Sequence, residues 1–298
     1  MPELPEVEIT ARLLDGALAG AQIESALAPG INALKTFDPP LAELESERIV
    51  AVRRRGKHLI VDVTGELSLL IHLMSAGRLQ LYGKRAGPRD RTSRLLLRVR
   101  TSGQGGQATS APTEGEATEL ELRLREFGSK QAAWVKLLRT DALERDDSLA
   151  TLGPEAWPDP PPLAEVLDAP RPLHALLRDQ RVITGIGRSW VDEILWQAKL
   201  SPYKRGGDLD AQEAERLRGV IVEILGGAIA HYEQAVSLPV PDKLPMPLRV
   251  HRHEGEPCPR CATTLRAVHF EDYVIAYCPA CQTDGRVLKD RRLSRLLR

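Results

Sequence analysis

The feature that most constrains the fold of this chain is a pair of Cys-x2-Cys motifs near its C-terminal end. Cys258 and Cys261 form the first motif, Cys278 and Cys281 form the second, and 16 residues separate the two. This spacing is typical of a four-thiolate zinc site, in which each motif forms a tight turn that directs two sulfurs at one tetrahedral ion. The β-type run 273–277 leads into the second motif, so we expect a zinc-bound β-hairpin. Four free thiols or two disulfides are the alternatives, and disulfides are rare in cytosolic proteins.

A second chemical feature lies at the N-terminus, where the chain begins MPELPEVE. Four thiolates leave zinc no open position for a substrate, so the one predicted Zn2+ ion is structural and catalysis must lie elsewhere. A small residue at position 2 permits removal of the initiator methionine, which exposes Pro2 as a secondary amine. An α-amino group has a pKa near 8, against about 10.4 for lysine, so more of it is unprotonated at neutral pH. Such an amine can form a Schiff base with a carbonyl-like carbon, and the adjacent Glu3 can move protons.

The same N-terminal residues also fit a simpler interpretation. A proline near a helix start, with acidic residues in the first turn, is a common helix N-terminal signal. The helical spacing of Val7, Ile9, Leu13, Leu14 and Leu18 predicts such a helix. On this interpretation the motif only begins a helix.

The patterns that follow change from strand-like to helical. Short β-type runs separated by turn signals occur at 49–52, 59–63, 69–73, 95–99, 120–124 and 133–137. Periodic apolar positions predict helices within 173–177, 191–200 and 211–230. We therefore expect an α+β protein with an N-terminal β-sandwich, flanking helices and a helical C-terminal part.

Local composition predicts the domain organisation. Residues 101–118 are rich in Gly, Ser and Thr and lack apolar periodicity, which predicts a disordered insertion between strands. Seven prolines between 154 and 172 suit a linker. We expect a catalytic β-sandwich domain at 1–150, a linker at 151–172, a DNA-binding domain at 173–248, a zinc finger at 249–285 and a basic tail at 286–298.

Charge and hydropathy limit the classes of function. The chain has 41 basic and 41 acidic residues, so its average charge does not predict a nucleic-acid-binding protein. Basic residues are nevertheless concentrated at 53–57 and 285–298. No run approaches the roughly 20 apolar residues that span a bilayer, and the N-terminus does not resemble a secretory signal. We expect a cytoplasmic protein without membrane partners.

The motifs occur together in an order that resembles the Fpg/Nei family of bifunctional DNA glycosylases and abasic-site lyases. The N-terminal motif and the finger lie at opposite ends of a chain of matching length. The matching segments between and around them are RRGK (54–57), LIHL (70–73), GRL (77–79), Arg125 with FG (127–128), LGPE (152–155), DQ (179–180), ITGIG (183–187), DE (192–193), GEPC (255–258) and YCPACQ (277–282). The resemblance covers nearly the whole chain except 101–118.

This resemblance implies a fold and a set of functional residues. It implies a β-sandwich followed by a helix–two-turn–helix domain and a zinc finger, which act as a monomer on damaged double-stranded DNA. Pro2 is then the nucleophile that attacks the sugar C1′, Glu3 transfers protons, and Lys57 positions phosphate or assists at the sugar. Contacts to DNA are expected from Arg125, Phe127, His174, Gly187, Arg188 and Tyr273.

Several positions depart from the family pattern, as in a divergent actinobacterial-type branch. Arg188 stands where the family has a phosphate-binding Asn, and Glu126 where the inserting loop has its second Arg. Ser75 occupies the position of the void-filling methionine, and His174 that of a lysine. Tyr273 replaces the finger arginine that assists the second elimination, which argues against that step here. A weakened wedge favours abasic sites as substrates, because they have no base to extract.

We therefore expect an abasic-site lyase with DNA N-glycosylase activity on oxidised bases, which acts in base excision repair through β-elimination. A catalytically weakened protein that binds damaged DNA is the alternative, and retention of Pro2, Glu3 and Lys57 argues against it. A zinc-ribbon RNA-binding protein would explain the finger but leaves MPELPEVE without a role. The expected location is the cytoplasm, in association with the nucleoid if the source is bacterial.

Overall fold

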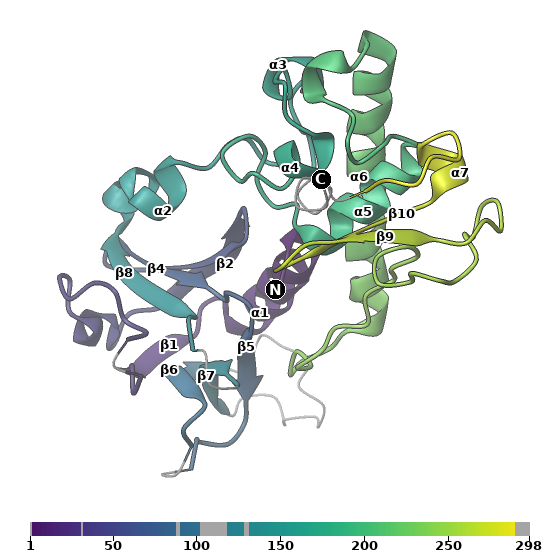
Figure 1. Cartoon of the computed structure of the whole chain (residues 1–298). Helices are drawn as coiled ribbons and strands as arrows, with labels where there is room; N and C mark the ends of the chain where they lie inside the picture. Colours follow the sequence, from purple (N-terminus) through teal and green to yellow (C-terminus); the bar gives the residue numbers. More distant parts are fainter. Residues whose placement is uncertain (1, 31, 88–89, 102–117, 128–130, 290–298) are drawn as a thin grey trace. The chain divides into compact units, whose positions relative to one another are not determined.

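The computed structural model describes the chain except residues 1, 31, 88–89, 102–117, 128–130 and 290–298 (Figure 1). The chain forms two compact units. The first unit comprises Met1–Thr151 and Ile229–Pro245, and the second comprises Leu152–Ala228 and Met246–Arg298. The predicted α+β class is confirmed, since helices and antiparallel sheets both contribute. The functional domain boundaries expected from composition stay predictions.

The described residues of the first unit form a long helix and eight strands, together with shorter helical segments. Its elements are α1 (Leu4–Leu18), β1 (Gln22–Leu27), η1 (Leu41–Leu44), β2 (Ile49–Arg55), β3 (His58–Val63), β4 (Leu67–His72), β5 (Gly77–Tyr82), β6 (Ser93–Thr101), β7 (Thr118–Glu126), β8 (Trp134–Arg139), η2 (Thr140–Arg145) and α2 (Asp147–Ala150). One antiparallel sheet has the order β2-β3-β4-β8 and the other has the order β1-β6-β7-β5.

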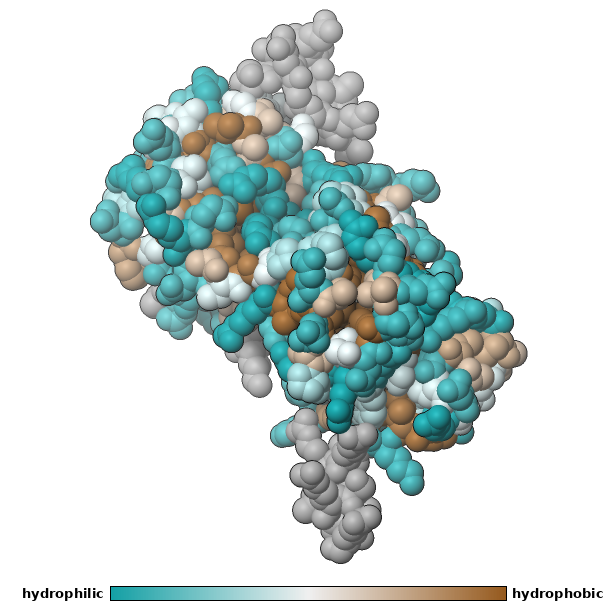
Figure 2. Space-filling model, turned by 90° about the horizontal axis from the view of Figure 1, so that it is seen from above, coloured by the Kyte–Doolittle hydropathy of each residue, from teal (hydrophilic) through white to brown (hydrophobic). Residues whose placement is uncertain are grey.

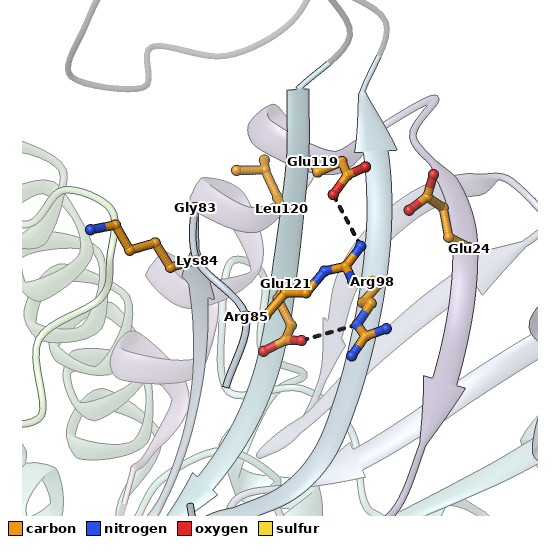
Figure 3. A pocket seen from close by; sticks show the side chains of 8 residues that line it. All are labelled: Glu24, Gly83, Lys84, Arg85, Arg98, Glu119, Leu120 and Glu121. Atoms are coloured by element: carbon orange, nitrogen blue, oxygen red, sulfur yellow. Dashed lines mark hydrogen bonds and ion pairs between the residues drawn. The ribbon is translucent and has the colours of Figure 1, made fainter. Parts of the chain in front are cut away.

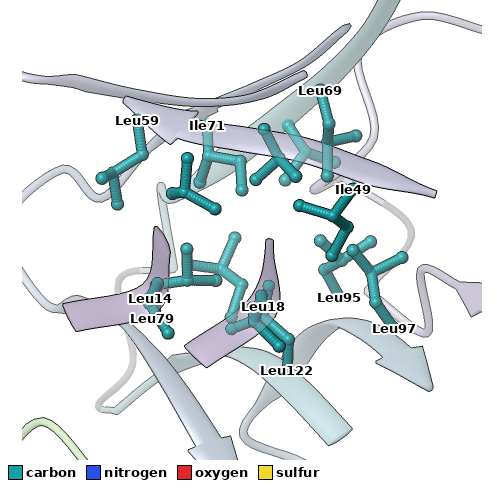
Figure 4. Close-up of a cluster of buried hydrophobic side chains, with 14 of the residues drawn as sticks. Leu14, Leu18, Ile49, Leu59, Leu69, Ile71, Leu79, Leu95, Leu97 and Leu122 are labelled. Carbon is teal, nitrogen blue, oxygen red and sulfur yellow. The ribbon is translucent and has the colours of Figure 1, made fainter. Parts of the chain in front are cut away.

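The apolar residues of both sheets share one core (Figure 4). Leu59, Leu69 and Ile71 contribute from β3 and β4, and Leu97 and Leu122 contribute from β6 and β7. All five side chains are fully buried. Burying apolar area of this extent is the main favourable term in folding, so the alternating patterns of the strands account for the two-layer arrangement. The β-sandwich predicted from the sequence is therefore present.

Helix α1 begins as the sequence predicts. Glu3 is its N-cap, Pro5 lies in its first turn, and Glu3 and Glu6 form a reciprocal capping box. Leu14 and Leu18 from its apolar face are fully buried in the core of the sandwich. The helix interpretation and the catalytic interpretation of MPELPEVE are thus compatible, because the same residues that begin the helix also present the N-terminus.

Three sequence expectations need correction or lie outside the described residues. The β-type runs missed β1 altogether, and they also missed β5, which begins at Gly77. A Cβ at Gly77 would lie 2.4 Å from the carbonyl oxygen of Leu73, so only glycine permits this close turn into the strand. Most of the expected insertion, 102–117, lies outside the described residues, whereas Thr101 and Thr118 at its ends pair in β6 and β7.

The second unit is mainly helical. Its elements are α3 (Leu163–Val166), α4 (Leu173–Leu176), α5 (Arg188–Gln197), η3 (Gly206–Asp208), most of α6 (Ala211–Ala235), β9 (Arg266–His269), β10 (Val274–Tyr277) and α7 (Pro279–Gln282). The last residues of α6, from Ile229, belong to the first unit. The strands β9 and β10 pair as an antiparallel hairpin that leads into the second cysteine motif, as predicted.

The surface is mostly polar. Figure 2 shows one face on which hydrophilic residues predominate and hydrophobic residues form small areas between them. The large hydrophobic side chains that are exposed are Leu27, Phe37, Val50, Phe127 and Val287. Isolated exposed apolar residues are normal, so they do not by themselves indicate an interface. Among the residues that the structure describes, no helix has the length and apolar character needed to cross a lipid bilayer.

Candidate functional site

The N-terminal turn of the first unit is held by a chain of hydrogen bonds. Pro2 is half-buried, and Glu3 and Glu6 are buried at the start of α1. The Glu3 backbone N–H donates to Glu6 Oε2 (2.8 Å), and the buried hydroxyl of Tyr232 donates to Glu6 Oε1 (2.8 Å). Burial and then the negative charge of Glu6 raise the pKa of Tyr232, so its hydroxyl keeps its proton. Glu6 is therefore fixed as a hydrogen-bond acceptor for the backbone of Glu3, the residue that follows Pro2.

Lys57 lies in the two-residue turn between β2 and β3. Gly56 has a φ of 58°, the left-handed conformation that a tight hairpin turn requires and that glycine adopts without strain. The buried guanidinium of Arg54 donates to the Gly56 carbonyl oxygen (2.9 Å) and to Glu8 of α1 (2.9 Å). Arg54 thus connects the turn of Lys57 to the helix that begins at Pro2. Lys57 itself is buried, which is rare for a lysine and typical of one with a specific role.

Two histidines and a tryptophan pack behind this turn. His58, His72 and Trp134 occupy neighbouring positions on β3, β4 and β8, because His58 pairs with His72 and His72 pairs with Trp134. The ring centroids of His58 and His72 are 4.6 Å apart, and those of His72 and Trp134 are 5.6 Å apart in a stacked arrangement. Burial lowers the pKa of His58 to about 4 and that of His72 to about 3. Both rings are neutral at pH 7, and His72 packs between His58 and Trp134.

Arg125 and Phe127 lie at the end of β7. The Arg125 guanidinium lies 4.6 Å from the centre of the Phe127 ring and donates to the Tyr82 hydroxyl (2.7 Å). Phe127 is 38% exposed, enough for contact with a partner. Glu126 points the other way, is buried, and accepts hydrogen bonds from the backbone N–H groups of Ala132 and Ala133. It shapes the connection to β8 rather than the exposed surface.

The four cysteines of the second unit lie together. Their sulfurs are within 4.8 Å of one another, with Cys261 3.4 Å from both Cys278 and Cys281. A tetrahedral ion with Zn–S bonds of about 2.3 Å requires sulfurs about 3.8 Å apart, and a disulfide requires about 2.05 Å. The cluster therefore fits a metal ion and excludes disulfides in this arrangement. Hydrogen bonds from Thr263 lower the pKa of Cys261 to about 6, which favours the thiolate that a metal needs.

Helix α5 supports this cluster from inside the second unit. The indole N–H of Trp196 donates to Cys258 Sγ (3.3 Å), and Trp196 packs with Val250, Leu265 and both buried cysteines. The Arg260 guanidinium covers the Trp196 ring at 4.3 Å and donates to its carbonyl oxygen (2.9 Å). The cysteine motifs are thus anchored to a helix as well as to each other.

Asp192, also on α5, lies between two histidines. It is buried, accepts from the Ala276 backbone N–H (3.0 Å) and lies 2.7 Å from His251 Nδ1. The His174 Nε2 atom is 3.3 Å from Asp192 Oδ1, close enough for an ion pair but not aligned for a hydrogen bond. Burial lowers the pKa of His174. Because His174 is only 2% exposed, we now expect it to position its neighbours rather than to contact DNA directly.

The turn predicted before α5 is held together by the side chain of Gln180. Gln180 donates to the Ile186 carbonyl oxygen (2.9 Å) and accepts from the Gly185 backbone N–H (3.0 Å). Gly187 is the N-cap of α5 and is buried, whereas Arg188 is exposed and pairs with Asp272 (3.0 Å). The turn therefore presents Arg188 at the surface and keeps the glycines inside.

One further pocket lies on the outer side of the sheet that contains β6 and β7 (Figure 3). Charged side chains line it, and four of them form ion pairs: Arg85 with Glu119, and Arg98 with Glu121. Since these charges are already compensated, we do not assign the pocket a ligand.

Sequence comparisons decide the family. A family model described as the formamidopyrimidine-DNA glycosylase N-terminal domain matches residues 1–125, and one described as the formamidopyrimidine-DNA glycosylase H2TH domain matches residues 159–239. A formamidopyrimidine-DNA glycosylase of Cereibacter sphaeroides is 32% identical over 300 residues, which cover 95% of this chain and 100% of that protein. The chain belongs to the formamidopyrimidine-DNA glycosylase family.

Two further relatives of this family member are informative. An uncharacterized formamidopyrimidine-DNA glycosylase-like protein of Mycobacterium tuberculosis is 39% identical over 126 residues, which cover 42% of this chain and 80% of that protein. The solved structure of Lactococcus lactis Fpg (MutM) in complex with DNA containing N7-benzyl-Fapy-dG has a TM-score of 0.77 and 25% identity, and covers 95% of this chain and 100% of that one. The likeness to the Fpg/Nei family seen in the motifs is therefore confirmed.

This member of the formamidopyrimidine-DNA glycosylase family carries supporting residues that sequence reasoning did not find. Tyr232, Asp192 and Arg178 had no motif that marked them. Asp192 was noted only as part of a matching segment, and its position between two histidines depends on contacts distant in sequence. A buried tyrosine hydroxyl or carboxylate shows no sequence signal until its partner is known.

Proposed function

We propose that this member of the family removes damaged bases from double-stranded DNA and cleaves the resulting abasic sites, with Pro2 as the nucleophile. The observation that carries the proposal is the N-terminal turn. Pro2 is half-buried, and the bonds from Tyr232 to Glu6 and from the Glu3 backbone to Glu6 fix the backbone that follows it. An amine fixed in this way loses little conformational freedom when it attacks, which favours a near-attack geometry.

The proposed chemistry follows from the secondary amine. The Pro2 nitrogen forms a bond to the sugar C1′ as the bond from C1′ to the base, or to the hydroxyl of an abasic sugar, breaks. The Pro2 N–H proton leaves with the departing group. The C1′–O4′ bond of the sugar ring then breaks as O4′ takes a proton from Glu3, which leaves an iminium ion between C1′ and the Pro2 nitrogen that withdraws electrons from C2′. Loss of a C2′ proton then expels the 3′ phosphate, which is β-elimination. We assign proton transfer to Glu3, and positioning of the sugar or phosphate to Lys57.

Of the residues predicted to contact DNA, Arg125, Phe127, Gly187 and Arg188 are proposed as contacts. Arg125 and Phe127 suit contact with the DNA strand opposite the damaged one, since one is a cation and the other an exposed aromatic ring. Gly187, at the start of α5, and the exposed Arg188 suit a phosphate. We propose that the four cysteines hold one Zn2+ ion that is structural, because four thiolates complete its coordination. A cytoplasmic, nucleoid-associated location follows from the proposed substrate.

Trapping of a covalent intermediate tests the proposal. Borohydride should reduce the Schiff base between the protein and abasic-site DNA and leave a stable adduct. We expect Pro2→Gly to trap much less, and a chain that retains an extra residue before Pro2 to trap none, because its proline nitrogen is an amide. Peptide mass analysis should place the adduct on Pro2. Unchanged trapping by the extended chain, in a preparation with wild-type thermal stability, would exclude Pro2 as the nucleophile.

We also propose that abasic sites are preferred over intact lesions. Ser75, at the position expected to fill the vacated space, is exposed and small, so it offers little to replace an extruded base. Single-turnover rates on duplexes that differ only in the lesion should be at least about tenfold higher for an abasic site than for an oxidised purine or pyrimidine. Faster cleavage of the oxidised-base duplexes would contradict this preference. A protein that binds these duplexes but traps none would instead be the damage-binding alternative.

A further inference from the structure

Tyr273 is the centre of an aromatic and cationic cluster in the second unit. Phe270 stacks on it with ring centroids 4.4 Å apart and an interplanar angle of 8°. The His174 ring lies nearly parallel to it at 5.9 Å. Two guanidinium groups lie over the same ring, that of Arg178 at 4.2 Å from its centre and that of Arg188 at 5.7 Å. Four side chains, from α4, the segment after it, α5 and the hairpin, thus lie around one tyrosine.

The two arginines differ in their partners. Arg188 is bound by Asp272, through both its backbone carbonyl oxygen and its carboxylate. Within the described part of the chain, the Arg178 guanidinium makes no hydrogen bond and no ion pair. It stacks instead on the ring of Tyr273. Asp179, its neighbour in sequence, pairs with Arg171 instead. Arg178 is half-buried, so the side chain is partly accessible to solvent.

A stacked guanidinium is well suited to bind an anion. Stacking uses the flat face of the group and leaves its N–H donors, which lie in the plane, free for an acceptor. The ring also fixes the orientation of the side chain, so less conformational freedom is lost when a ligand binds. Because no carboxylate of the described residues competes for it, the preferred acceptor is a group with several anionic oxygens, and a phosphodiester is one.

We propose that Arg178, held by Tyr273, binds a phosphate of the DNA backbone, and that Tyr273 is a positioning residue for it. This inference rests on the proposed function for its ligand, since it names the DNA group that this surface binds. It changes the expected role of Tyr273 from direct DNA contact to support of a cation. It also gives His174 a role, since His174 packs against the same ring from the interior.

The salt dependence of DNA binding tests the inference. The probe is a duplex with a tetrahydrofuran abasic analogue, which has no C1′ hydroxyl to displace and therefore cannot be cleaved. Its Kd is measured by fluorescence anisotropy between 50 and about 200 mM KCl. Each phosphate contact contributes about 0.9 to the slope of log Kd against log salt concentration. We expect Arg178→Ala to reduce the slope by about 0.9 and to weaken binding roughly tenfold at the lowest salt concentration.

Further variants distinguish a positioning role of Tyr273 from a general effect of lost positive charge on DNA binding. Tyr273→Phe keeps the ring and should bind like wild type, whereas Tyr273→Leu removes it and should show part of the effect of Arg178→Ala. Arg178→Lys keeps the charge without the flat group and should be intermediate. Arg181→Ala removes an exposed arginine of the same segment and should leave the slope nearly unchanged.

Two outcomes would overturn the inference. One is a wild-type slope for Arg178→Ala or, if that variant does not fold, for Arg178→Lys together with Tyr273→Leu. The other is an equal loss of slope for Arg178→Ala and Arg181→Ala, which would indicate charge alone. Borohydride trapping is measured in parallel, so a failure of the lyase proposal is distinguishable: wild type would then bind with the full slope but trap no DNA.

Discussion

At the scale of single residues, the N-terminal site depends on a hydroxyl that no motif predicts. Tyr232 donates to Glu6, 226 positions away, and Glu6 accepts from the Glu3 backbone, so the orientation of the N-terminal amine depends on a distant residue. The carboxylate of Glu6 has two oxygens, and each has one of these donors. Loss of the hydroxyl would leave a buried carboxylate oxygen without this partner.

We therefore expect Tyr232→Phe to slow the formation of the trapped adduct while leaving the Kd for DNA nearly unchanged. The free energy of unfolding should fall by about 1.5–3 kcal/mol, which is the usual contribution of a hydrogen bond to a charged group. Urea denaturation and the rate of borohydride trapping measure the two effects. Tyr277→Phe is the matched control, because Tyr277 is also buried and its hydroxyl accepts from the Leu288 N–H. Equal slowing by both variants would refute a specific role for Tyr232.

At the scale of secondary-structure elements, three neighbouring strands carry a buried aromatic cluster next to the Lys57 turn. His58 and His72 are neutral at pH 7 because burial lowers their pKa values. In the unfolded chain a histidine has a pKa near 6.5. Below that value the unfolded state binds more protons than the folded state, so stability falls as pH decreases.

This linkage predicts a loss of stability in mild acid. Together the two histidines should lower the free energy of unfolding by about 4 kcal/mol between pH 7 and pH 5, since each contributes about 1.4 kcal/mol per pH unit below 6.5. This window lies above the range in which ordinary carboxylates titrate. Urea denaturation should show that His72→Gln loses less stability than wild type over the same range, and that His269→Gln, on the exposed surface, behaves like wild type. An identical pH dependence for wild type and His72→Gln would contradict the assignment.

At the scale of the whole molecule, two units with separate cores contribute different parts of the proposed machinery. Pro2, Glu3 and Lys57 belong to the first unit, whereas Arg178, Arg188 and the cysteine cluster belong to the second. The net charge of the chain is zero, so affinity for DNA must come from the placement of a few cations rather than from overall charge. The fold of the cysteine cluster therefore matters for binding as much as it does for stability.

Removal of the metal should weaken DNA binding and leave the fold of the first unit largely intact. We expect about one zinc per chain by elemental analysis, and none in a Cys278→Ser variant, because three thiolates and a hydroxyl bind zinc more weakly than four thiolates. That variant should lose affinity for DNA while it keeps most of the strand signal of the first unit in circular dichroism. Ala280→Ser, an exposed position in the same motif, should retain both metal and binding. Full DNA affinity in metal-free protein would contradict the structural role.

Elements with a clear local pattern were predicted from the sequence, whereas features that depend on distant contacts were not. The strands β2, β3, β4, β6, β7 and β8 and the helices α1, α5 and α6 follow from the period of their apolar residues, although their ends differ by several positions. The strand β1 was not predicted, because its residues alternate weakly and it is paired only through β6. The strand β5 was not predicted either, and the close approach of the Leu73 carbonyl oxygen that requires glycine at its start is a feature of the folded chain.

The sequence by itself determined the chemistry that depends on adjacent residues. It placed Pro2 before Glu3 at a helix start, Lys57 after Gly56 in a turn, and four cysteines at the spacing of a metal site, because short segments adopt such geometry from local rules. Only the tertiary structure decided that Tyr232 meets Glu6 and that Arg178 lies on Tyr273. These pairs are far apart in the chain, and packing of the two cores, rather than any local preference, brings each pair into contact.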